Sequence, residues 1–294
     1  MTVALGNNIA LPLSSALSYR LAFDTMGKLA NYGKLGGTAD PDAVIEALFA
    51  SGEQGAWYDP SDLSTMFQDS AGTTPVTADG QPVGLILDKS GRGNHASQAT
   101  AAKRPLYKTS GGLHWLQFDG VDDALATASI DFTSTDKMSV FSGANRTSST
   151  GESILVELSS TVLSAPGAFA IYSPIGSNDM GAYLRGTDGT FLYGTPVNNG
   201  TPYVGYLGFD IAGAARADEI KIRVNGVIPT ITTGGNANAG TGNFGTYPMY
   251  IGARGGNSKY FNGKIYSIIV LGRTATTQEI TDTETWVNSK TGAY

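Results

Sequence analysis

A close pair of carboxylates is the usual chemical signature of glycoside hydrolysis, because one group acts as an acid and the other as a base or nucleophile across the scissile bond. Glu152 and Glu157 are the only closely spaced glutamates in a predicted strand. Strand side chains alternate between the two faces, so residues five positions apart point to opposite faces. The spacing therefore disfavours a shared catalytic site and a glycoside hydrolase.

Nucleophilic chemistry is poorly supported as well. His95 and His114 are the only histidines, there is no cysteine, and no Gly-x-Ser-x-Gly elbow precedes a helix. We expect both histidines to be structural. The segments Gly91-x-Gly93 and Gly252-x-x-Gly255-Gly256 do not lie between a strand and a helix, which phosphate-binding glycines require. They are interpreted as turns.

Aromatic residues offer a better binding signal, because 14 tyrosines and 3 tryptophans occur in a chain that is only 15% charged. Tyrosine combines an apolar ring with a polar edge, which suits contact with sugars or protein surfaces. Several tyrosines lie near predicted loops or strand ends, where sandwich proteins place binding sites. The alternative is that most of these rings pack in the core. The candidates are Tyr183, Tyr193, Tyr203, Tyr247, Tyr250 and Tyr260.

The composition excludes other classes of function. A net charge of −6 without a Lys/Arg cluster argues against nucleic-acid binding. Polar residues and Pro12 interrupt the first 21 residues, so no signal peptide is predicted, and no apolar run approaches the ~20 residues that cross a membrane. We expect synthesis in a cytoplasm and no membrane insertion.

The elements divide the chain into residues 1–54 and residues 55–294. The first part is predicted to be an arm for attachment or oligomerisation, ending in a connector helix that begins near Asp40-Pro41 and stops at Ser51-Gly52. From Trp57 onward, short apolar runs alternate with Gly, Asp, Asn and Pro, which is typical of an all-β domain. A long set of antiparallel strands predicts a two-sheet jelly-roll sandwich.

Nine strands are predicted from these apolar runs. A turn signal and the composition of the last strand add further predictions. Asn225-Gly226 predicts a two-residue hairpin turn between Lys221–Val224 and Val227–Ile231. The last strand is apolar on both faces, so it should be central. The predicted strands are Val83–Asp88, Trp115–Phe118, Lys137–Asn145, Ser153–Leu158, Ala168–Tyr172, Tyr203–Phe209, Glu219–Val224, Met249–Ala253 and Lys264–Leu271.

A C-terminal helix is predicted after Gly272. Thr276 and Glu279 fit a capping box, and the helix should end near Lys290 and Gly292. Trp286 lies near its apolar face and is expected to pack on the sandwich.

Three segments carry a resemblance to a known family: Asp88–His95, Leu116–Asp123 and Tyr260–Tyr266. Together they resemble laminin-G-like (LamG) domains of the concanavalin A-like lectin superfamily, from about Trp57 to the end. The stretch Trp57–Pro105 is similar to LamG-type structural proteins of tailed bacteriophages. The resemblance implies that Asp88 and Asn94 shape a tight loop after an early strand.

The resemblance also bears on metals and enzymes. LamG relatives often bind calcium through loop carboxylates, which makes Asp119, Asp122 and Asp123 the candidate ligands, with Asp88 as a further neighbour. The alternative, that these residues cap backbone amides, stays open. The Glu-x-Asp-x-Glu arrangement of hydrolases in the superfamily is absent, so the chain is expected not to be an enzyme.

By resemblance, the expected role is that of a virion structural protein associated with a tail fibre or baseplate. It would bind other virion proteins through residues 1–54 and recognise a glycan or protein on the host surface. A homo-oligomer, preferably a trimer, suits that position. The alternatives are a capsid decoration protein and, less favoured, a polysaccharide-active enzyme.

Overall fold

The structure is a computed structural model that describes residues 40–294, apart from 148–150, 177–178 and 236–237. The chain divides after Ala43, and the unit from Val44 to Tyr294 contains the β domain. The arm predicted within residues 1–39 lies outside the described residues. The connector helix is present as α2 (Ala43–Leu48), and Ile45, Leu48 and Phe49 are buried beside Trp57. No described helix has the length and apolar character needed to span a bilayer.

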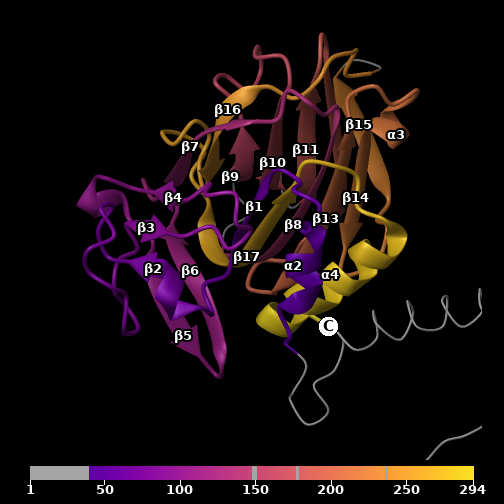
Figure 1. Ribbon diagram of the computed structural model, residues 1–294. Helices are drawn as coiled ribbons and strands as arrows, with labels where there is room; N and C mark the ends of the chain where they lie inside the picture. Colours follow the sequence, from indigo (N-terminus) through magenta and orange to yellow (C-terminus); the bar gives the residue numbers. More distant parts are fainter. Residues whose placement is uncertain (1–39, 148–150, 177–178, 236–237) are drawn as a thin grey trace, which may run out of the picture. The chain divides into compact units, whose positions relative to one another are not determined.

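The described strands form two antiparallel sheets (Figure 1). The seven-stranded sheet has the order β14-β13-β8-β17-β6-β5, with β1 also paired to β17. Its strands are β1 (Gly55–Tyr58), β5 (Leu106–Ser110), β6 (Leu113–Asp119), β8 (Lys137–Arg146), β13 (Tyr203–Asp210), β14 (Ile220–Val224) and β17 (Asn262–Leu271).

The ten-stranded sheet has the order β15-β12-β11-β10-β9-β16-β7-β4-β3-β2. Its strands are β2 (Met66–Phe67), β3 (Leu85–Ile86), β4 (Ala96–Ser97), β7 (Leu125–Asp131), β9 (Ile154–Leu158), β10 (Ala168–Ile175), β11 (Asp179–Arg185), β12 (Gly189–Pro196), β15 (Ile231–Gly235) and β16 (Thr246–Ile251). Short helical turns lie at η1 (Leu63–Thr65), η2 (Ala101–Lys103) and α3 (Arg216–Glu219).

The two sheets share one apolar core. Phe169 of the ten-stranded sheet stacks on Phe209 of the seven-stranded sheet with ring centroids 4.9 Å apart. Alternate residues of most strands enter this core, among them Leu184, Leu192 and Leu207, and all three are buried. The predicted all-β sandwich is therefore confirmed, and β17 lies between β8 and β6 as expected of a central strand.

A second apolar cluster covers the other side of the seven-stranded sheet. Helix α4 (Thr277–Thr291) contacts β8, β13 and β17 (Figure 1). Thr276 and Glu279 form the predicted capping box, and Gly292 ends the helix in the left-handed conformation. Trp286 meets Trp57 edge to face at 5.7 Å, which confirms the expected packing of the helix on the sandwich.

The hairpin prediction was correct at its turn and wrong at its second strand. Asn225 and Gly226 have φ of 52° and 74°, and Val224 and Val227 exchange backbone hydrogen bonds. The chain then leaves the seven-stranded sheet, because β15 pairs with β12 in the ten-stranded sheet. An Asn-Gly turn specifies local backbone geometry only, and the sheet that the following residues join is decided by tertiary packing.

The loop of Asp88 and Asn94 has the structural role that the family resemblance implies. The buried carboxylate of Asp88 accepts hydrogen bonds from the amides of Trp57 and Asn94, each at 2.9 Å, and from Ser90 at 2.8 Å. His95 accepts a hydrogen bond from the Asp88 amide at 3.0 Å, and His114 lies 2.7 Å from the Tyr107 hydroxyl. Asp88 therefore anchors β1 to the loop.

The Trp57–Trp286 contact should be a large contributor to stability. Replacing Trp286 by Ala removes a side chain that is 4% exposed, and we expect a loss of about 3–5 kcal/mol in the free energy of unfolding. Thr285→Ala on the exposed face of the same helix should change it by less than about 0.5 kcal/mol. Urea denaturation followed by fluorescence measures both, and equal effects would contradict the proposed importance of this contact.

Candidate functional site

The outer face of the ten-stranded sheet carries a cross-strand row of polar and aromatic residues. Tyr250 of β16 pairs with Glu157 of β9, which pairs with Ala170 of β10. Ala170 pairs with Tyr183 of β11, and Tyr183 pairs with Phe191 of β12. The strand neighbours of these residues enter the core shared by the two sheets. The row therefore faces away from the core.

Glu157 lies on this face by regular alternation with Val156 and Leu158, and a bulge in β9 brings Ile154 to the same face. Ile171 pairs with Val156 whereas the next residue, Tyr172, pairs with Ile154, so Leu155 is the extra residue. Ile154 and Glu157 consequently lie on the same face although they are three positions apart. The simple alternation used to place the glutamates on opposite faces was therefore wrong for this strand.

The charges of both glutamates influence the pKa of one tyrosine on the outer face. Burial raises the pKa of the Tyr172 hydroxyl to about 12, Arg254 opposes the rise, and the charges of Glu152 and Glu157 add to it. Glu152 is exposed and forms an ion pair with Lys259, whereas Glu157 is 1% exposed. The two carboxylates therefore have very different environments.

The Glu157 carboxylate is held firmly at one oxygen only. Its Oε1 accepts hydrogen bonds from the Ser159 hydroxyl at 2.6 Å and from the Gly255 amide at 3.2 Å. Its Oε2 has no hydrogen-bond partner among the described residues and lies 3.9 Å from Nε of Arg254. Burial raises the pKa of Glu157, and the hydrogen bonds and Arg254 oppose that rise.

Arg254 is positioned by a tight loop after β16. Its amide donates to the Ser258 carbonyl at 2.8 Å, and Gly255 and Gly256 have positive φ, as their interpretation as turn glycines predicts. Nη2 donates a hydrogen bond to the Tyr172 hydroxyl, and the guanidinium lies 5.5 Å from the centre of that ring. Nε is buried without a hydrogen-bond partner in the described part of the chain.

These residues line a cavity of about 400 Å³, a size suited to a small ligand. Its wall combines the ion pair with hydroxyl and amide side chains, an aromatic ring and two apolar side chains. The lining residues are Glu157, Ser160, Thr161, Val162, Leu163, Tyr250, Arg254, Gly255, Asn257 and Ser258.

An aromatic strip continues along the same face. Tyr172 meets Phe191 edge to face at 5.4 Å, and Phe191 lies 5.8 Å from Tyr193. Tyr183 is partly exposed, and its ring depends on Gly189, where an added Cβ would lie 2.1 Å from the hydroxyl. Together with the cavity, the strip forms the outer-face site.

The structure separates the six tyrosines proposed from the sequence. Tyr250 lines the cavity, and Tyr183 and Tyr193 lie on the same sheet face. Tyr203 is 1% exposed, belongs to the core and donates a hydrogen bond to Ser173 at 2.7 Å, so it is not accessible to a surface ligand.

Two of the six tyrosines are separate from the cavity lining. Tyr247 packs on the core and donates to the Pro166 carbonyl at 2.8 Å. Tyr260 lies in the loop before β17 and is partly buried.

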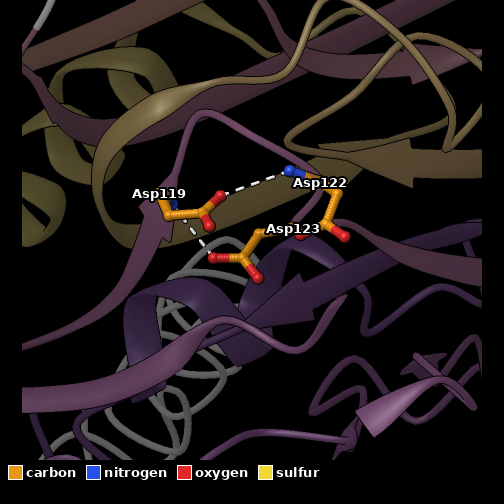
Figure 2. Close-up of side chains that lie close together, drawn as sticks. All are labelled: Asp119, Asp122 and Asp123. Carbon is orange, nitrogen blue, oxygen red and sulfur yellow. Dashed lines mark hydrogen bonds between the residues drawn. The ribbon is translucent and has the colours of Figure 1, made fainter. Parts of the chain in front are cut away.

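The acidic loop between β6 and β7 is the candidate metal site. Ligand atoms of Asp119, Asp122 and Asp123 all lie within 4.8 Å of one another (Figure 2). Asp88 does not join this group, because its carboxylate is engaged by Trp57, Ser90 and Asn94. The turn requires Gly120, whose φ is 77° and whose added Cβ would lie 2.6 Å from Asn262.

The same carboxylates already cap the loop. Asp119 Oδ1 accepts a hydrogen bond from the Asp122 amide at 3.3 Å, and Asp123 Oδ2 accepts one from the Asp119 amide at 3.0 Å (Figure 2). Asp119 Oδ1 also accepts one from the Val121 amide at 2.8 Å. Calcium takes six to eight oxygen ligands. Three carboxylates would supply part of that shell, so the residues fit calcium in chemical type. The hydrogen bonds to the loop amides show the capping role directly.

Burial, together with the neighbouring carboxylates, raises the pKa of Asp123. Burial raises its pKa to about 6, the hydrogen bond from the Asp119 amide opposes the rise, and the charges of Asp119 and Asp122 add to it. A folded-state pKa above the ordinary 3.8 means that the folded protein favours the protonated form. This contribution to stability is complete below about pH 4 and is lost as the pH rises through 6.

We therefore predict that Asp123→Asn removes a pH-dependent loss of stability. Between pH 4 and pH 7 this carboxyl should reduce the free energy of unfolding of the native protein by at most about 3 kcal/mol. Asp122→Asn, which removes one neighbouring charge, should reduce the loss without abolishing it. Urea denaturation across this range measures the slopes, and identical slopes in native protein and Asp123→Asn would refute the assignment. If calcium binds here, millimolar calcium should flatten the native slope.

Comparison with known proteins gives structural matches only: no family model and no curated protein matches the sequence. The botulinum neurotoxin serotype G binding domain matches with a TM-score of 0.52 and 10% identity, over 69% of this chain and 49% of that one. Trypanosoma rangeli sialidase in complex with the inhibitor DANA matches with a TM-score of 0.51 and 13% identity, over 92% of this chain and 38% of that one.

This chain spans about half, or less, of the length of those two proteins. Identities of 10% and 13% show a common fold and carry no further information about activity. The fold is accordingly a jelly-roll sandwich of the concanavalin A-like type, in agreement with the expectation from the sequence.

Proposed function

We propose that this protein is a non-enzymatic glycan-recognition protein that binds its ligand at the outer-face site. The observation that carries the proposal is the cavity around Glu157 and Arg254, where two buried polar atoms, Oε2 and Nε, have no hydrogen-bond partner among the described residues. Leaving a buried polar group unsatisfied costs about 1–3 kcal/mol. At this pair the partly exposed Arg254 guanidinium is the group that a hydroxyl-rich ligand can reach.

Aromatic residues support the same proposal. Tyr250 contributes a partly exposed ring to the cavity, and Tyr183, Phe191 and Tyr193 extend the aromatic surface across neighbouring strands. Aromatic rings provide large apolar faces with little conformational entropy to lose on binding. A linear glycan could lie along this row, with one sugar unit in the cavity.

The environment of the glutamates favours binding without turnover. Glu157 is 1% exposed and lies beside Arg254, and Glu152 forms an exposed ion pair with Lys259. Neither carboxylate is presented as a free acid or base to a bond in the cavity. Release of reducing ends from a bound polysaccharide would support the enzymatic alternative instead.

The biological setting that we propose follows the resemblance to LamG-type phage proteins. The protein would be made in the host cytoplasm and assembled as a trimer into a tail fibre or baseplate through residues 1–54, with the sandwich displayed to the host surface. A capsid decoration protein is the alternative. Copy number and position in a cryo-electron microscopy map of purified particles distinguish the two.

Tyr250→Ala should weaken glycan binding by about tenfold or more, because the ring is lost from the cavity wall. Tyr250→Phe keeps the ring and should retain most of the affinity. We would first identify bound sugars on a glycan array with the full chain, and then measure affinities by isothermal titration calorimetry.

The matched control for this experiment is Tyr247→Ala. Tyr247 is also a partly exposed tyrosine of β16, but its hydroxyl donates to Pro166 and it does not line the cavity. Affinity that falls equally in Tyr247→Ala and Tyr250→Ala would contradict the location of the site. Absence of any bound glycan would overturn the proposed function.

Attachment to the particle can be tested by removing residues 2–39. The deletion should end before Val44, because Ile45, Leu48 and Phe49 pack beside Trp57 and their removal would uncover the second apolar cluster. We expect the shortened protein to keep its thermal unfolding temperature and to be absent from particles assembled in complementation. Normal incorporation would refute the role of this segment.

A further inference from the structure

The charge balance of the cavity is set by a single ion pair. Of the described residues that line it, Arg254 is the only cation and Glu157 the only carboxylate, and their Nε and Oε2 atoms are 3.9 Å apart. The Arg254 side chain is 21% exposed and that of Glu157 1%, so the guanidinium is the group that a ligand meets. The buried carboxylate of Glu157, in the adjacent wall, compensates the positive charge of the guanidinium.

Both members of the pair are fixed in place. Glu157 Oε1 is held by Ser159 and by the amide of Gly255, the residue that follows Arg254. Arg254 is held by the Tyr172 hydroxyl through Nη2. Because one loop supplies both the guanidinium and an amide donor to the carboxylate, the pair cannot easily separate to expose an uncompensated cation.

An acidic ligand would therefore bind poorly. Its carboxylate would approach a guanidinium that is already compensated, and it would be repelled by the negative charge of Glu157 in a partly desolvated site. The adjacent ion pair of Lys259 and Glu152 supplies no net positive charge either. An uncharged ligand does not incur this repulsion.

The remaining wall suits hydroxyl groups. The Arg254 guanidinium is partly exposed, and Ser160, Thr161 and Ser258 contribute hydroxyls that both donate and accept. Leu163, which is 56% exposed, and Tyr250 provide apolar surface for the carbon skeleton of a ring.

We infer that the cavity selects an uncharged sugar unit over its carboxylated counterpart, with Arg254 as the binding residue and Glu157 as the positioning residue that neutralises it. This inference depends on the proposed function, because it specifies the ligand class of that site. It separates this protein from glycan-binding proteins that recognise acidic sugars through an uncompensated arginine.

The test compares sugar pairs that differ only in oxidation at C6. Methyl glucoside is compared with methyl glucuronide, and methyl galactoside with methyl galacturonide, by ligand-observed NMR and competition with an array-identified glycan, using the full chain at neutral pH. We expect the neutral member of at least one pair to bind about tenfold more tightly than its acidic partner.

Variants test whether Glu157 is responsible for the preference. Glu157→Gln keeps the shape of the side chain but removes its charge, so it should reduce or reverse the preference in favour of the acidic sugar. Glu152→Gln makes the same charge change at an exposed ion pair, where solvent screens it, and should have a much smaller effect. Thermal unfolding of each variant verifies that it is folded.

The outcomes distinguish this inference from the proposed function. Tight binding of an acidic sugar by the native protein, or an unchanged preference in folded Glu157→Gln, would overturn the inference and leave glycan binding intact. If no glycan binds at all, both the inference and the proposed function fail.

Discussion

The organisation of the molecule depends on one constraint, the apolar core that the two sheets share. Most strands of the ten-stranded sheet direct alternate residues toward the seven-stranded sheet, as Phe169 does toward Phe209. The residues between these inward positions must then point outward. On β11 and β12 the outward positions include Tyr183, Phe191 and Tyr193, which produces an aromatic face without any additional structural device.

Strand β9 contains a local exception to that alternation. The extra residue in β9 allows Leu155, Val156 and Leu158 to enter the core while Ile154 and Glu157 remain on the outer face. Without the bulge, one of the two ends of this strand would have to reverse. Bulges often redirect a side chain next to a functional site, and here the bulge brings Ile154 to the face that carries Glu157.

Local patterns in the sequence were sufficient for the features that depend on neighbouring residues. The capping box of Thr276 and Glu279 and the central position of the last strand could both be predicted. Strands such as β11 and β12 were missed because glycines and polar residues interrupt their apolar pattern. The sheet joined by β15 was also unpredictable, since turn chemistry carries no information about distant partners.

The same reasoning explains why only part of the site could be predicted. Tyr250, Tyr183 and Tyr193 were proposed as candidates from composition and position, whereas Arg254 was not, because nothing local relates it to Glu157 across 97 residues of sequence. That pairing depends on the register between β9 and β16 and on the glycine turn after β16. Long-range pairs of this kind become visible only when the register of the sheet is known.

The geometry of the pair argues for a role beyond stability. A buried ion pair often contributes no more stability than apolar residues of similar volume, unless close contact and hydrogen bonds offset the cost of desolvation. Here the facing atoms are 3.9 Å apart, too far for a direct hydrogen bond, and each lacks another hydrogen-bond partner in the described chain. An ion pair with a purely structural role would stabilise the fold more if its two atoms were closer together. The open spacing instead leaves the guanidinium at the cavity wall, where its exposed part can donate hydrogen bonds to a ligand hydroxyl.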